Sequence, residues 1–341
     1  MELNRQTKDC PYNKLSKKSF FPQLENTNGS LLLERNSDFI INSNDKIISF
    51  GSCFASKIKI ICNKLASKLG INTQNSLLSE SSHPFSTTLG QQDFRITTSY
   101  KEENAFSAFF AVAHESGHSL YEQGLSSEYF GTTIGQAASY GVHESQSLFW
   151  ENRIAGSKPF MKSWFPYFKK YFPNNFKNFD ENTFYSNAIQ VKPGGLIRVE
   201  SDEVTYCLHI IIRYEIERKL INSEMEVEEV ENVWNQMYEK RLGITPPDSK
   251  RGFLQDVHWS CGAFGYFPSY TLGHLMSAQL TKALEEDLKS NIDDLISNQK
   301  TPEILEWMRT NIHSLGAEYK PLDLVKKITN GIKCNALESI L

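Results

Sequence analysis

The residues best suited to chemistry form an HExxH pattern, HESGH at residues 114–118. The surrounding stretch, AFFAVAHESGHSLYEQGL, has the apolar spacing of a helix, and histidines four positions apart on a helix share one face. Two imidazoles placed in this way can share a metal ion. Glu115 follows the first histidine closely enough to act as a general base on water at that ion. The sequence therefore predicts a metal site on His114 and His118.

A catalytic zinc ion needs a third protein ligand and an open position for water. The segment HESQS at 143–147 lies on the next predicted helix and offers His143 and Glu144. Adjacent residues on a helix point about 100° apart, so only one of the two can complete the site. The spacing alone favours neither.

The elements that must position these residues are mostly helical. Apolar residues recur at helical spacing in five segments, and DFRITTSY at 93–100 alternates as a strand does. The sequence Pro-Gly-Gly at 193–195 predicts the tight turn of a β-hairpin. The predicted helices span residues 104–125, 134–154, 204–220, 226–241 and 275–288, and the predicted hairpin strands span residues 188–191 and 196–199.

The region ahead of these elements has two parts. Residues 1–44 are polar, rich in Asn, Lys and Ser, and weakly periodic, which predicts a polar leader. From residue 45, a short apolar run, the turn GSC and a helical pattern ending at Gly70 predict one strand–turn–helix unit. The polar stretch at 72–82 predicts a junction.

Composition excludes several classes of protein. The 36 basic and 40 acidic side chains leave a formal net charge of −4, so the protein lacks the positive electrostatic potential that attracts nucleic acid phosphates. The sequence has no apolar run of membrane-spanning length, and its N-terminal residues lack the apolar core of a signal peptide. Six scattered cysteines without a CxxC pair indicate reduced thiols and no thiolate zinc site. We therefore expect a cytoplasmic protein with no nucleic acid or membrane partner.

Several blocks of this sequence occur in the order seen in the M32 (Taq-type, thermostable carboxypeptidase 1) metallocarboxypeptidases. From about residue 79 to 341, the chain resembles that family. The matching blocks are HPF at 83–85, DFRIT at 93–97, HESGH at 114–118, HES at 143–145, IRVESD at 197–202, GFLQDVHW at 252–259 and the tyrosine-containing block that ends in TLG at 271–273.

The resemblance implies a fold and a metal site. The fold class is a mainly α, zincin-like helical metallopeptidase with a small β-sheet near the active site, preceded by a short strand–turn–helix fragment. One Zn²⁺ per chain would be held by His114, His118 and Glu144, which resolves the choice left open by spacing. Glu115 resembles the general base and proton shuttle.

The resemblance also implies an activity, a zinc-dependent release of C-terminal amino acids from peptides with a free C-terminus, and a homodimer. A terminal carboxylate needs an arginine fork, and a tetrahedral oxyanion needs hydrogen-bond donors. In the matching blocks, Arg95 or Arg198 would bind the carboxylate. His83 would either bind substrate or shape the site. His258, together with Tyr270 or Tyr266, would stabilise the oxyanion.

The N-terminal part departs from this pattern. Residues 1–78 do not resemble the long helical region that precedes HPF in the family, and about 45–70 resembles the start of a GSCFA-family domain. Ser52 is placed there like the nucleophile of SGNH-type hydrolases, which needs a histidine and an acid from the far end of its domain. The sequence thus predicts a polar leader at 1–44, a GSCFA-like fragment at 45–78 and an N-terminally truncated M32-like catalytic region at 79–341. An inactive zinc-binding remnant or fusion product, and a GSCFA/SGNH-type serine hydrolase, are the alternatives.

Overall fold

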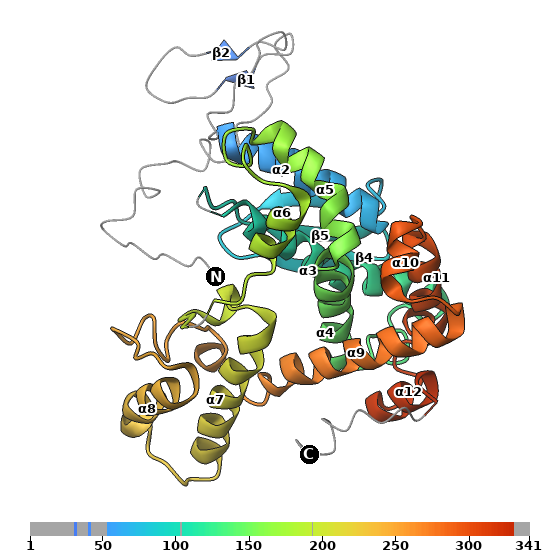
Figure 1. The fold of residues 1–341 in the computed structure, drawn as a ribbon. Coiled ribbons are helices and arrows are strands. Elements are labelled where there is room, and N and C mark those ends of the chain that lie inside the picture. The colour runs from blue at the N-terminus through green and yellow to red at the C-terminus, as the bar shows by residue number, and fades with distance from the viewer. Residues whose placement is uncertain (1–30, 33–39, 42–52, 103, 193, 331–341) are drawn as a thin grey trace. The chain divides into compact units, whose positions relative to one another are not determined.

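The computed structural model describes residues 31–32, 40–41 and 53–330, except 103 and 193 (Figure 1). The chain divides into two compact units, Met1–Gly51 and Ser52–Leu341. In the first unit, β1 (Leu31–Leu32) pairs antiparallel with β2 (Ile40–Ile41). The predicted strand after residue 45, the GSC turn and Ser52 lie outside the described residues.

The second unit is mainly helical with a small sheet, as the sequence predicts. None of its described helices is both long and apolar enough to cross a membrane. The main helices are α2 (Cys53–Leu69), α3 (Ala105–Gly124), α4 (Tyr140–Leu148), α5 (Lys158–Tyr171), α6 (Glu181–Ala188), α7 (Glu203–Ile221), α8 (Val230–Leu242), α9 (Pro268–Leu288), α10 (Ile292–Ser297), α11 (Thr301–Asn311) and α12 (Pro321–Ile328), and the π-helix η3 (Phe149–Ala155) continues α4.

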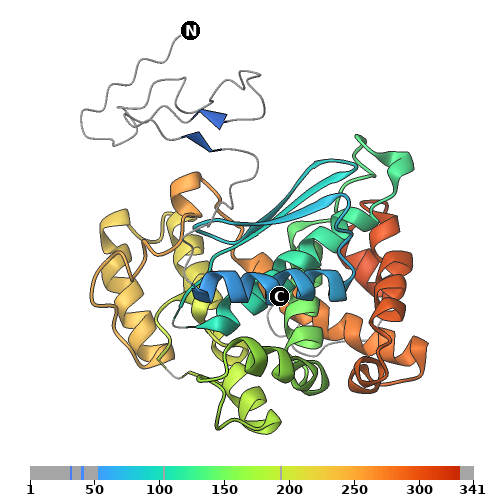
Figure 2. The same cartoon turned by 90° about the horizontal axis from the view of Figure 1, so that it is seen from above.

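The sheet has three strands in the order β3 (Ser76–Glu80), β5 (Asp93–Thr98) and β4 (Phe85–Gly90). The central strand β5 pairs parallel with β3 and antiparallel with β4, and Figure 2 shows the three strands side by side. The predicted strand at 93–100 is confirmed. The predicted junction at 72–82 contains β3, which the sequence pattern does not indicate because the strand is defined by its pairing with β5.

The helices that carry the predicted site begin at polar caps. Asn104 accepts a hydrogen bond from the backbone N–H of Phe106 (3.1 Å) at the start of α3, and Ser139 accepts one from Val142 (3.1 Å) at the start of α4. The predicted helices at 104–125, 204–220 and 226–241 are confirmed within a few residues. The helix predicted at 134–154 begins later, at Tyr140, and the one predicted at 275–288 begins earlier, at Pro268.

The β-hairpin predicted around residues 193–195 is not seen, since the described residues between 189 and 197, which are all of them except 193, contain no strand. Gly194 does adopt the left-handed conformation of a turn (φ 79°). The segment after it is held by side chains instead of by a partner strand. The backbone N–H of Arg198 donates to Oε1 of Gln255 (2.8 Å), and residues 198–200 form a 3-10 turn. A long-range contact therefore replaces the local pairing.

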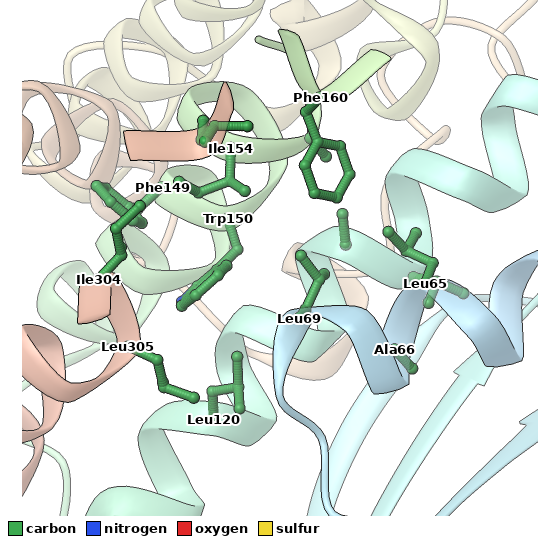
Figure 3. Packing of buried hydrophobic residues seen from close by; sticks show 14 of the residues in the cluster. Leu65, Ala66, Leu69, Leu120, Phe149, Trp150, Ile154, Phe160, Ile304 and Leu305 are labelled. Carbon is green, nitrogen blue, oxygen red and sulfur yellow. The ribbon is translucent and has the colours of Figure 1, made fainter. Parts of the chain in front are cut away.

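One hydrophobic core joins the HExxH helix to its neighbours (Figure 3). Trp150, from η3, is fully buried in the cluster that also contains Leu120 of α3 and Leu305 of α11. Leu65 and Leu69 of α2 belong to the same cluster, so α2 packs in the same core as α3. The helix predicted at about 54–70 is thereby confirmed as α2 and forms part of the second unit.

Candidate metal centre

His114 and His118 lie on one face of α3, as their spacing predicts, with ring centroids 4.9 Å apart. The Nε2 atom of His114 lies 3.6 Å from Oε1 of Glu144, and Nε2 of His118 lies 3.5 Å from Oε2 of the same carboxylate. These three side chains offer ligand atoms that all lie within 4.8 Å of one another. In the part of the chain that the structure describes, this is the group able to hold a metal ion with three ligands.

Two glycines allow the three helices that frame this group to approach closely. A Cβ atom on Gly117, between the two histidines, would lie 2.6 Å from the backbone oxygen of Gln146 on α4. A Cβ atom on Gly273 of α9 would lie 2.8 Å from Cγ of Glu144. Helix α4 therefore packs with its backbone against α3, and Glu144 occupies the space next to α9.

The other ring nitrogen of each histidine has a partner. Nδ1 of His114 lies 2.8 Å from Oε2 of Glu151, a residue of the π-helix η3. Nδ1 of His118 lies 2.6 Å from Nδ1 of His143, and Nε2 of His143 lies 3.0 Å from Oε1 of Glu122. Because both Nδ1 atoms are engaged in this way, the two Nε2 atoms are left to face Glu144.

The charges within this group suit a cation. Burial raises the pKa of Glu144, but the two histidines outweigh burial and hold this pKa at about 2. Burial lowers the pKa of His118 to about 4, so its ring is neutral at pH 7. Burial lowers the pKa of His114, but Glu144 and Glu151 outweigh burial and raise it to about 10, so this ring is protonated in the metal-free protein. Metal binding requires an ionised carboxylate and neutral imidazoles, so a bound metal ion would displace that proton. Oε1 of Glu144 is buried without a hydrogen-bond partner among the described residues. The donor set therefore fits a divalent metal ion.

Glu115 is buried beside the group, with 8% of its surface exposed, and hydrogen-bonds to Ser86 of β4. Burial raises its pKa to about 7, and the negative charge of Glu144 adds to this shift. A carboxyl group with a pKa near neutrality can both accept and return a proton.

The predicted histidine and tyrosines come together at the start of α9. Nε2 of His258 lies 3.1 Å from the hydroxyl of Tyr270, and the ring of Tyr266 lies 5.3 Å from the His258 ring. Burial raises the pKa of both tyrosines, and the charge of Glu144 adds to both shifts. The two tyrosines therefore lie close enough to Glu144 for its charge to act on them, and His258 contacts both tyrosines.

Of the two predicted arginines, Arg198 lies near this cluster. It is 5% exposed, its guanidinium lies 4.7 Å from the ring centre of Tyr270, and it donates to the hydroxyl of Tyr206 (2.8 Å). Nε and Nη2 of Arg198 donate to Oδ1 of Asp256 at 3.0 and 2.8 Å. Arg213 binds the other oxygen of this carboxylate at 2.6 Å. Two buried guanidinium groups thus share one carboxylate.

Arg95 lies on the face of the three-stranded sheet that is opposite to the face carrying Ser86. Ser86, which contacts Glu115, pairs with Ile96, and directly paired residues of antiparallel strands share a face. Arg95 precedes Ile96 and therefore faces the opposite way, where it binds Asp93 of its own strand. The structure does not bring Arg95 to the metal group. His83, the other predicted substrate residue, is exposed in the turn before β4.

Glu122 and Glu151 were not expected from the sequence, although helical spacing carries a signal for both. Glu122 follows His118 by one turn of α3, and Glu151 follows Glu144 by two turns. The π-helical geometry at residues 149–155 changes where Glu151 points, and the apolar pattern does not reveal it. Asp256 and Arg213 were also not singled out, because their partners lie far away in the sequence.

An HExxH helix whose two histidines face a glutamate from a second helix defines a metallopeptidase type of site. Within that class, the family model for carboxypeptidase Taq (M32) metallopeptidases matches residues 8–337, and the chain belongs to this family. The match includes residues 45–70, so the likeness of that segment to a GSCFA domain stays a prediction.

Known relatives agree with this assignment. Carboxypeptidase 1 of Bacillus subtilis is 44% identical over 265 residues, covering 77% of this chain and 52% of the relative. Thermostable carboxypeptidase 1 of Thermus thermophilus is 40% identical over 267 residues, covering 78% and 52%. The chain therefore spans about half the length of the curated relatives it matches.

Solved structures show the same fold. The M32 carboxypeptidase from Deinococcus radiodurans R1 superposes with a TM-score of 0.76 at 33% identity, covering 81% of this chain and 55% of that chain. The metallocarboxypeptidase 1 of Trypanosoma cruzi gives a TM-score of 0.77 at 34% identity, covering 87% and 62%.

Proposed function

We propose that this protein is a zinc-dependent carboxypeptidase that releases the C-terminal amino acid from peptides. The observation that carries the proposal is the convergence of His114, His118 and Glu144, with Glu115 buried beside them. Two relatives with the printed name carboxypeptidase 1 or thermostable carboxypeptidase 1 support the substrate class. Peptides with a free C-terminus are the proposed substrates, and a cytoplasmic homodimer is the proposed state.

The two histidines and Glu144 would hold the zinc ion, which when bound acts as a Lewis acid toward the scissile carbonyl and lowers the pKa of water. Glu115 would remove a proton from the attacking water and return it to the leaving amine. Its pKa of about 7 makes both transfers accessible near neutral pH. The hydroxyl of Tyr270, next to His258, is the proposed donor to the developing oxyanion.

Arg198 is the proposed site for the terminal carboxylate of the peptide. Arg198 and Arg213 share the single carboxylate of Asp256, so this buried cluster carries one positive charge in excess. An anion that reaches Arg198 would balance that charge. Arg95 is paired with Asp93 on the far face of the sheet, which argues against the same role for it.

The proposal is tested by incubating the protein with an N-blocked short peptide that has a free C-terminus. We expect release of the C-terminal amino acid, loss of release with a chelator, and recovery with added Zn²⁺. The same peptide amidated at its C-terminus is the matched control and should stay intact. No release by folded, zinc-loaded protein would contradict the proposal and favour the inactive zinc-binding remnant. Sedimentation of the same sample tests the homodimer.

A further inference from the structure

His143 stands between a proposed metal ligand and a carboxylate. Its Nδ1 atom lies 2.6 Å from Nδ1 of His118, and its Nε2 atom lies 3.0 Å from Oε1 of Glu122. The two histidine rings are also in contact, with centroids 4.7 Å apart. His114, by contrast, reaches Glu151 directly. The two histidines of the HExxH pattern are therefore supported in different ways.

The chemistry of Glu122 fixes the direction of the hydrogen bonds in this chain. An ionised carboxylate only accepts hydrogen bonds, so Nε2 of His143 must carry a hydrogen and donate it to Glu122. One hydrogen lies between the two Nδ1 atoms, and it belongs to His118 when Nε2 of His118 binds a metal ion, because that nitrogen must then offer a lone pair. Nδ1 of His118 must therefore be the donor, and Nε2 of His118 keeps a lone pair that faces Glu144.

The surroundings of Glu122 keep its carboxylate in the accepting form. Burial raises its pKa, but hydrogen bonds from His143 and Thr88 outweigh burial and hold this pKa below its usual value. The hydroxyl of Thr88 donates to Oε2 at 3.3 Å, which leaves Oε1 for His143. A cavity of about 180 Å³ adjoins the pair and is lined by Ser86, Thr87, Thr88, Ser119, Glu122 and His143. Water in this polar cavity can solvate the carboxylate.

We propose that His143 is a positioning residue that links His118 to Glu122 and fixes His118 in the tautomer able to bind a metal ion. This inference rests on the proposed metal site. His143 itself does not coordinate, because its two nitrogens face His118 and Glu122. Its neighbour Glu144 supplies the ligand, so the two adjacent residues of α4 serve the same ion in different ways.

The test compares variants that keep or remove the two hydrogen bonds of His143. In His143→Leu both bonds are lost, and we expect the affinity for Zn²⁺ to fall by about 10- to 100-fold. In His143→Asn, the amide offers an acceptor toward His118 and a donor toward Glu122, so we expect most of the affinity to return. Competition with a chromophoric chelator measures the dissociation constant of Zn²⁺ for each variant.

A second measurement reads the tautomer of His118 directly. Long-range ¹H–¹⁵N spectra of the metal-free protein should show a hydrogen on Nδ1 of His118 in the wild type and in His143→Asn. In His143→Leu we expect a mixture of tautomers. A merely structural role of His143 would change stability and leave this tautomer unchanged. The control is Glu128→Gln, which removes an exposed negative charge beyond the end of α3 and should change neither readout.

The inference is overturned if the Zn²⁺ affinity of His143→Leu is within about twofold of that of the wild type, because the expected loss is much larger. It is also overturned if His118 keeps its tautomer in His143→Leu. Should His143→Leu fail to fold, Glu122→Gln supplies the same comparison, because its amide no longer requires a donor from His143. A wild type that binds no Zn²⁺ would contradict the proposed function. The tautomer spectra of the metal-free protein would still decide the role of His143.

Discussion

At the scale of single residues, two neighbouring carboxyl groups have pKa values that their surroundings push apart. Glu144 faces two imidazoles, which outweigh burial and hold its pKa at about 2. Glu115 lies next to the negative charge of Glu144, and burial together with that charge raises its pKa to about 7. Such a separation supports the proposal that Glu144 stays ionised as a metal ligand and that Glu115 transfers the proton.

Glu115→Gln should therefore separate metal binding from turnover. The amide keeps the shape of the side chain but cannot take a proton, so we expect the rate of peptide hydrolysis to fall by at least about 10²- to 10⁴-fold. The Zn²⁺ affinity should stay close to that of the wild type. Glu144→Gln is the contrasting variant and should lose the metal as well. Substantial hydrolysis by Glu115→Gln would contradict the role given to Glu115.

Asp256 is the second residue with a measurable role, since it balances two buried guanidinium groups. Asp256→Asn removes the charge that Arg198 and Arg213 share, and leaving buried charges unpaired costs about 3–5 kcal/mol of unfolding free energy. Urea denaturation measures this loss. Asp248 is the matched control, because it binds Arg251 in an exposed pair, and Asp248→Asn should cost about 1 kcal/mol or less.

At the scale of elements, the site depends on how closely α3, α4 and α9 approach one another. Gly117 of α3 faces the backbone of α4, and Gly273 of α9 faces the side chain of Glu144. Neither position has room for a methyl group. The ligands on α3 and α4 are brought together by backbone contact, so a small change in helix separation changes the geometry of the metal site.

Gly117→Ala should push α3 and α4 apart. The added Cβ atom would lie 2.6 Å from both the backbone oxygen of Gln146 and the Cα atom of Ser147, and relief of this overlap should cost about 1–3 kcal/mol. The Zn²⁺ affinity should fall with it. The control is Gly141→Ala on α4, whose Cβ atom would meet its nearest neighbour at 3.7 Å, an ordinary contact. Equal effects of the two substitutions would contradict this account.

At the scale of the whole molecule, buried histidines make the fold sensitive to acid. Burial lowers the pKa of His313 to about 3 and the pKa values of His209 and His258 to about 4. The usual pKa of histidine, which applies to the unfolded chain, is about 6.5. Between this pH and the lowered pKa values of the folded state, the unfolded chain therefore binds more protons than the folded chain. Stability is complete above this range and falls as the pH falls through it.

His313→Gln tests this dependence away from the metal ligands. His313 is fully buried, with Nε2 2.9 Å from Oε1 of Gln146, and a glutamine amide can also donate there. Each such histidine contributes a slope of about 1.4 kcal/mol per pH unit in this range. The unfolding free energy of the metal-free variant should therefore fall less steeply between pH 6.5 and 5 than that of the wild type. Parallel curves would show that His313 does not contribute.

Local spacing in the sequence predicted much of the site because a helix repeats at short range. The HExxH spacing placed His114 and His118 on one face of α3 and Glu115 beside them, and the apolar spacing predicted a helix over residues 104–125. The same local rule left His143 and Glu144 equivalent. The helical period gives the direction of a side chain relative to its own axis, but it does not say where the next helix lies.

Spacing could not decide between such alternatives, because contacts between distant segments have no periodic signal. The family resemblance favoured Glu144, and only the tertiary structure shows how its carboxylate reaches the two histidines. The packing of α4 on α3 directs Glu144 to the two Nε2 atoms and His143 to Nδ1 of His118. The pairing of β4 with β5 turned Arg95 away from the site, and Asp256 held Arg198 where a hairpin was predicted. The sequence by itself determined which residue types were available for metal chemistry, while long-range packing determined which of their atoms meet.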